Sequence, residues 1–219
     1  MLLIGMLDSP FVRRVAISMK LLGFGFEHGN WSVGRDAERI RQYNPLLRVP
    51  TLMLDSGEML TESSAILDYL DQEAGPARAL LPASGVERRQ ALQIMALAIG
   101  AAEKSRDAIY EHQFRPAEKL HQPWLDRLNS QIVGALGELE QTAARSQGDF
   151  WIGQRLTQAD ISATCALTFM RDVRQLDFAV NHPQLERLRL RNETRPEFAA
   201  TYTAFLPPKP DARQPTRTR

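Results

Sequence analysis

The first 75 residues alternate short apolar runs with helical patterns, which predicts a mixed sheet joined by crossover helices. Leu2 to Leu7 is an apolar run without polar alternation, as expected for a strand buried on both faces. From Val12 to Leu22 apolar residues recur at three- and four-residue steps, which predicts a helix that ends at Gly23. Residues 24–31 predict a second strand, parallel to the first because crossovers are right-handed.

The remainder of this first part predicts a short helix, a hairpin and a closing helix. The short helix spans residues 36–42, and two strands at 51–54 and 59–61 flank a turn that contains a glycine. Ser63 or Ser64 is expected to cap the closing helix. The predicted order is therefore β-α-β-α-β-β-α.

Residues 75–85 contain two prolines and two glycines and predict a linker. From residue 86 onward the apolar residues follow only a helical period, so we expect an all-helical domain over 86–206 after a first domain over 1–75. The expected helices span 86–114, 123–145 and 156–174, and two shorter ones begin near Pro183 and Pro196. Residues 207–219 are rich in proline and polar groups and predict a disordered tail.

The charge balance argues against a nucleic-acid partner. The formal net charge is +1, and the first 75 residues hold 7 Lys and Arg against 10 Asp and Glu. No apolar stretch approaches the roughly 20 residues that span a bilayer, so we expect no membrane partner. The single cysteine, Cys165, excludes an intramolecular disulfide and fits a reducing, cytoplasmic compartment. It lies in an apolar helix, as a core residue would, and the four histidines lack metal-ligand spacing, so we expect no metal.

The segment Ser9-Pro10 is the first candidate for chemistry, because it places a hydroxyl where a strand meets a helix. Proline suits the first helical position, so Ser9 is the expected N-cap residue. The N–H groups and positive dipole end of such a helix favour anions, a thiolate included. The alternative is that Ser9 only caps the helix. The two arginines that follow, Arg13 and Arg14, could raise the local positive potential, although at least one is expected to face water.

Four segments together resemble the cytosolic glutathione S-transferases. They are Ser9–Val15, Asn44–Pro50, Thr61–Leu70 and Thr157–Ser162. The second is similar to the family pattern Asn-Pro-Leu-Gly-Lys-Val-Pro, whose last proline is cis, although Leu47 replaces the glycine here. The resemblance implies a thioredoxin-like first domain, an all-α second domain and a homodimer.

The resemblance also implies a glutathione site. Val49, before a cis Pro50, would pair with the peptide backbone of glutathione as an added strand. Arg48 would reach the glycyl carboxylate, while Ser63 and Glu62 would take the γ-glutamyl carboxylate and ammonium. Each residue also has a simpler interpretation: an ordinary trans proline, a solvated arginine, and a serine that is only a helix cap.

The implied mechanism uses Ser9 as a hydrogen-bond donor, not as a base, because an alcohol is too weak an acid to exchange a proton usefully with a thiol. The glutathione thiolate, bound as co-substrate, would then attack a small electrophile. The second-substrate site is expected between the domains, with Phe11, Glu103, Arg106 and Tyr110 as candidate walls. Alternatives are glutathione-dependent reduction, dehalogenation or isomerisation, and a non-catalytic interaction module.

The fourth segment carries a folding signal. Thr157 and Asp160 have the spacing of a capping box, and Leu156 and Ile161 stand where a hydrophobic staple would pack. We expect this box to stabilise the helix that follows without touching the chemistry.

Overall fold

The computed structural model describes residues 1–146 and 148–205. The first part of the chain forms a four-stranded sheet in the order β2-β1-β3-β4. Its strands are β1 (Leu2–Ile4), β2 (Glu27–Gly29), β3 (Thr51–Met53) and β4 (Met59–Thr61). Strand β2 is parallel to β1, as predicted, whereas β3 is antiparallel to β1 and to β4.

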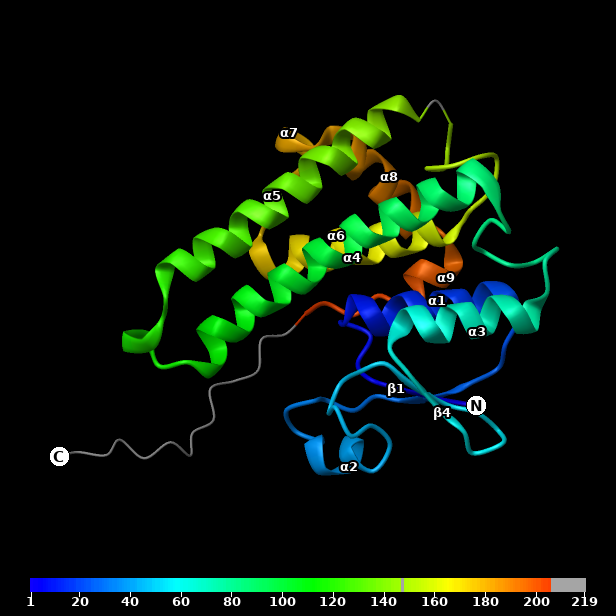
Figure 1. Cartoon of the computed structure of the whole chain (residues 1–219), viewed down its shortest axis with the longest axis horizontal. Helices are drawn as coiled ribbons and strands as arrows, with labels where there is room; N and C mark the ends of the chain where they lie inside the picture. Colours follow the sequence, from blue (N-terminus) through cyan, green and yellow to red (C-terminus); the bar gives the residue numbers. More distant parts are fainter. Residues whose placement is uncertain (147, 206–219) are drawn as a thin grey trace.

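Three helices accompany this sheet. They are α1 (Pro10–Leu22), α2 (Ala37–Arg41) and α3 (Ser63–Ala74). Helices α1 and α3 lie together on one face, and α2 lies on the other (Figure 1). Leu3 and Leu52 belong to the core that α1 and α3 form, while the fully buried Ile40 comes from α2. Ile4, next to Leu3 in β1, is also fully buried but lies outside that core, as expected for alternate side chains of a strand that is covered on both faces.

The second part of the chain is helical. Its elements are α4 (Gly85–Phe114), the 3-10 turn Ala117–Lys119, α5 (Gln122–Arg145), α6 (Gln158–Arg174), α7 (Phe178–Asn181), α8 (Pro183–Glu193) and α9 (Pro196–Ala199). The long helices α4 and α5 run side by side, and α6 also packs on α4 (Figure 1). No helix in the part of the chain that the structure describes is long and apolar enough to cross a membrane.

Each of the two hydrophobic cores includes side chains from the other part of the chain. Phe11 of α1 packs into the helical core. Ile161 and Cys165 of α6 and Phe198 of α9 pack into the core that the sheet forms with α1 and α3. Cys165 is therefore a buried core residue, as its apolar segment indicates. This exchange fixes the position of the α1 N-terminus against both parts.

Two consecutive arginines of α1 are buried, so the expectation that one of them faces water is wrong. Arg13 is 3% exposed and donates to both carboxylate oxygens of Glu193, at 2.8 and 2.6 Å. Burial alone would lower the pKa of Arg13, but the hydrogen bonds and charge of Glu193 raise it. Arg14 is 1% exposed and points toward the start of α3 and Ser162 of α6. Both side chains reach partners that the sequence places far away.

The predicted order of elements is confirmed, and apart from two short helical elements, the 3-10 turn and α7, the differences lie at element ends. The first strand stops at Ile4 because Gly5 has φ +131°, which turns the chain out of the sheet. Only Glu27–Gly29 pairs in the second strand, since β1 offers three residues as partners. Helix α7 was not predicted. The capping box of α6 is confirmed, with Asp160 as an acceptor for the Thr157 N–H. The predicted tail, 207–219, lies outside the described residues.

Candidate functional site

Ser9 occupies the predicted position at the start of α1. Its backbone is extended, and its carbonyl accepts the Arg13 N–H at 2.9 Å. Ser9 is the N-cap residue of α1, as predicted, but its side chain makes no capping hydrogen bond. The half-buried hydroxyl therefore stands at the positive end of a 13-residue helix, free of the bond that a cap would use.

The Val49-Pro50 peptide bond is cis, as the resemblance implies. This loop lies against the end of β1 at Gly5. A Cβ atom on Gly5 would come within 2.5 Å of Val12 Cγ2 and 2.8 Å of Val49 Cβ, so only glycine permits the approach. The close contact holds the Val49-Pro50 loop next to the turn that leads to Ser9.

Asn44 holds the same loop from within and is 1% exposed. Its amide nitrogen donates to the Arg48 carbonyl at 2.8 Å and to Thr51 Oγ1 at 3.1 Å, and its oxygen accepts the Leu46 N–H at 2.9 Å. Leu47 has φ +52°, the left-handed conformation that the glycine of the family pattern adopts readily. The loop therefore keeps a glycine-like path although a leucine occupies the position.

The start of α3 differs from the prediction. The N-cap residue is Glu62, whose carboxylate accepts the Ser64 N–H at 2.9 Å, so neither Ser63 nor Ser64 is the cap. Glu62 has φ +74°, which is strained for a residue with a side chain and is typical of functional sites. The longer Glu side chain reaches back to the helix end and leaves the Ser63 hydroxyl available for other partners.

The Ser63 hydroxyl lies between the Arg14 guanidinium and the Glu62 carboxylate. Its Oγ accepts a hydrogen bond from Arg14 Nη2 at 2.7 Å and donates to Glu62 Oε1 at 3.1 Å. Arg14 Nη2 also donates to Ser64 Oγ at 2.8 Å. The sequence suggested for Arg14 only that it could raise the local positive potential. Its position in α1, one helical turn after Pro10, gave no sign that it reaches α3.

The structure brings together part of the predicted second-substrate wall. The Arg106 guanidinium lies 5.6 Å from the centroid of the Phe11 ring and pairs with Asp107 at 2.7 Å. Phe11 is 8% exposed, so its ring belongs more to the helical core than to an open wall.

Tyr110 and Glu103 of α4 interact electrostatically with different charged groups. Burial raises the pKa of Tyr110, while the charges of Arg106, Asp8 and Arg48 act on the same hydroxyl. Tyr110 is therefore near the turn before Ser9 and the exposed Arg48. The charge of Glu103 acts instead on Arg14, whose pKa it raises.

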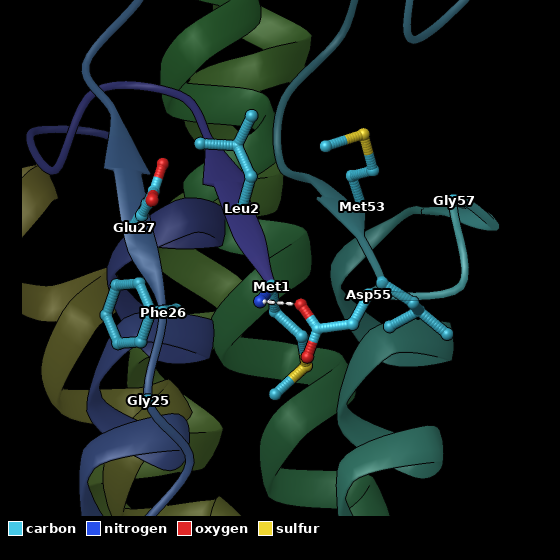
Figure 2. A pocket seen from close by; sticks show the side chains of 9 residues that line it. Met1, Leu2, Gly25, Phe26, Glu27, Met53, Asp55 and Gly57 are labelled. Atoms are coloured by element: carbon cyan, nitrogen blue, oxygen red, sulfur yellow. Dashed lines mark hydrogen bonds and ion pairs between the residues drawn. The ribbon is translucent and has the colours of Figure 1, made fainter.

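Two surface hollows are lined by none of the candidate site residues. One opens at the sheet end where β1 begins, and it is lined by Met1, Phe26, Met53 and Asp55 among others (Figure 2). The Met1 ammonium pairs there with Asp55 at 2.5 Å. Since Ser9 follows the other end of β1, this hollow is remote from the candidate site. The second hollow lies between the start of α4 and residues 145–146 and 148–154.

Comparisons with known proteins match both parts of the chain. A family model described as the N-terminal domain of glutathione S-transferase matches residues 3–78, and one described as the C-terminal domain matches residues 122–200. The chain is 30% identical to an uncharacterised GST-like protein, YibF, of Escherichia coli strain K12, over 92% of this chain and 98% of YibF.

Two further matches involve named chemistry. A probable maleylacetoacetate isomerase 1 of Drosophila melanogaster is 29% identical, over 79% of this chain and 67% of that protein. A glutathione S-transferase of Methylobacterium radiotolerans, solved in complex with glutathione sulfonate, superposes with a TM-score of 0.86 at 30% identity, covering 94% of this chain and 96% of that one.

Proposed function

Because this chain belongs to the glutathione S-transferase family, we propose that it binds glutathione and activates its thiol for reaction with a small electrophile. The observation that carries the proposal is the Ser9 hydroxyl, which stands at the N-terminus of α1 without a capping bond. A glutathione complex of a structural relative at 30% identity supports the choice of ligand.

Each part of glutathione has a proposed partner. The backbone of Val49, before Pro50, pairs with the cysteinyl backbone as an added strand. Arg48 takes the glycyl carboxylate with its forked donors. Glu62 and Ser63 take the ammonium and carboxylate of the γ-glutamyl end. Ionised groups at both ends then fix the position of the thiol beside Ser9.

The chemistry depends on the thiolate. A hydrogen bond from the Ser9 hydroxyl and the α1 dipole both favour the anion, and each pKa unit of lowering corresponds to about 1.36 kcal/mol. The sulfur then forms a bond to an electrophilic carbon, and the leaving group departs with its electron pair. Arg106, Tyr110 and Glu103 border the proposed second-substrate site, whereas the Phe11 ring packs mainly into the helical core.

Isomerisation is the second candidate reaction, because curated relatives are named probable maleylacetoacetate isomerases. In that reaction the same thiolate would add to an unsaturated substrate and leave again, so glutathione would be regenerated. A homodimer and a cytoplasmic location complete the proposal, as for the family in general.

Ser9→Ala tests the mechanism, with Ser9→Thr as the matched control that keeps a hydroxyl. We expect the alanine variant to lower the conjugation rate roughly a hundredfold, as loss of a donor to a developing anion does, with little change in glutathione affinity by calorimetry. Full activity of Ser9→Ala would remove Ser9 from the mechanism. Wild-type protein that gives no heat with glutathione would overturn the binding proposal, and binding without turnover of any electrophile would favour an interaction module.

A further inference from the structure

Arg14 is a buried cation whose hydrogen-bond acceptors are neutral. Its Nη2 donates to Ser63 Oγ and Ser64 Oγ, and its Nη1 donates to Ser162 Oγ at 3.2 Å. Its Nε–H has no acceptor within the described residues. A fully buried guanidinium held by hydroxyl groups alone retains much of the free-energy penalty of leaving water.

The carboxylates around Arg14 compensate this charge poorly. Glu62 Oε1 is 3.9 Å from Nη2, and the Glu62 side chain is 59% exposed, so water screens the pair. Glu103 also acts on Arg14, but only over a distance at which no ion pair forms. Burial lowers the pKa of Arg14 to about 10, so the group remains charged at neutral pH.

The Arg14 hydrogen bond also orients Ser63. Because Arg14 donates into one lone pair of Ser63 Oγ, the hydroxyl hydrogen must point to another acceptor. That acceptor is now Glu62 Oε1, at 3.1 Å. The Ser63 hydroxyl therefore reaches outward to a carboxylate at the start of α3, with the guanidinium behind it.

We infer that Arg14 is a positioning residue for the γ-glutamyl carboxylate of glutathione, acting through the Ser63 hydroxyl; this inference rests on the proposed function. The ligand carboxylate takes the place that Glu62 Oε1 holds at Ser63 and supplies the negative charge that Arg14 lacks. Glu62 is then free to meet the ligand ammonium. Arg14 itself touches no ligand atom.

The test compares two ligands by isothermal titration calorimetry. One is glutathione, and the other is 4-aminobutanoyl-cysteinylglycine, which keeps the ammonium and thiol but lacks the γ-glutamyl carboxylate. Wild-type protein should prefer glutathione. In Arg14→Gln the ratio of the two affinities should fall about tenfold, which corresponds to ~1.4 kcal/mol of charge-assisted bonding. Ser63→Ala should lower the same ratio, and the double variant should fall no further.

Arg13→Gln is the matched control, because Arg13 is equally buried in α1 but pairs with Glu193. It should lower the melting temperature and leave the affinity ratio unchanged. If Arg14→Gln does not fold, arginine side-chain ¹⁵N resonances of wild-type protein replace it, with the Arg14 signal assigned through Arg14→Lys. That signal should move with glutathione and stay with the analogue.

The outcomes separate the two claims. An unchanged ratio in Arg14→Gln, or an Arg14 resonance that moves equally with both ligands, overturns the role of Arg14 while glutathione binding stands. Wild-type protein that binds neither ligand overturns the proposed function and this inference together. A ratio that falls equally in Arg13→Gln also overturns it, since general loosening of α1 would then explain the effect.

Discussion

The Asn44 side-chain amide donates to the Arg48 carbonyl at 2.8 Å, and this bond closes the loop that presents Val49 and Pro50. The same amide reaches Thr51 at the start of β3. One buried side chain thus fixes both ends of the segment that we propose to pair with glutathione. Asn44, which begins one of the segments that carry the family resemblance, is therefore also the anchor of the loop.

Asn44→Asp is expected to weaken both the fold and glutathione binding. The aspartate keeps an acceptor for the Leu46 N–H but loses both donors, and it sets a carboxylate oxygen against the Arg48 carbonyl. We expect the free energy of unfolding in urea to fall by about 1 to 3 kcal/mol. Asn181→Asp, at an exposed side chain, is the control and should change stability little. Equal unfolding midpoints for the two variants would contradict this role of Asn44.

Local sequence signals predicted much of the fold. Pro10 after Ser9 placed the start of α1, and Thr157 with Asp160 placed the start of α6, because each signal acts within a few residues. The parallel pairing of β1 and β2 followed from the handedness of crossovers. These features depend on residues that are close in the sequence, so periodicity and capping rules can predict them.

Features set by distant partners were not predictable in this way. Arg14 is buried because α3 and α6 bring three hydroxyls to it, and no local pattern shows that meeting. Glu62 replaces Ser63 as the cap because its backbone adopts a positive φ, which propensity rules disfavour for a residue with a side chain. The cis peptide bond at Pro50 was expected only through the family resemblance.

Asp160→Ala should lower stability and spare the chemistry. Asp160 is fully buried, and its carboxylate accepts hydrogen bonds from the Thr157 N–H at 2.9 Å and the Trp151 N–H at 3.0 Å. Losing the cap costs about 0.5 to 2 kcal/mol, and the buried Trp151 N–H left without an acceptor adds to that loss. Thermal melts should therefore shift down clearly, while the glutathione affinity of the folded fraction stays unchanged.

Asp177→Ala is the matched control for Asp160→Ala. Asp177 caps α7 with a bond to the Ala179 N–H at 3.0 Å, but it is exposed. Water can replace the lost acceptor there, so its melt should move much less. Equal shifts for the two variants would show that burial of the capping box contributes nothing.

Cys165 is expected to be an inert thiol that makes the fold sensitive to alkaline pH. Burial raises the pKa of Cys165 from 9.0 to about 12, a shift that the charge of Arg13 opposes and that of Glu193 reinforces. Because the native state holds this proton more tightly than the unfolded chain, the contribution to stability is complete below pH 9 and is lost as the pH rises toward 12.

Two measurements check this behaviour of Cys165. A disulfide reagent at pH 8 should label the native protein far more slowly than the urea-unfolded chain, which offers one thiol. Between pH 8 and pH 10 the wild-type free energy of unfolding should fall by about 1 kcal/mol more than that of Cys165→Ala, in which the other titrating groups are unchanged. Rapid labelling of the native protein, or parallel stability curves for the two proteins, would show that the thiol is not held protonated in the core.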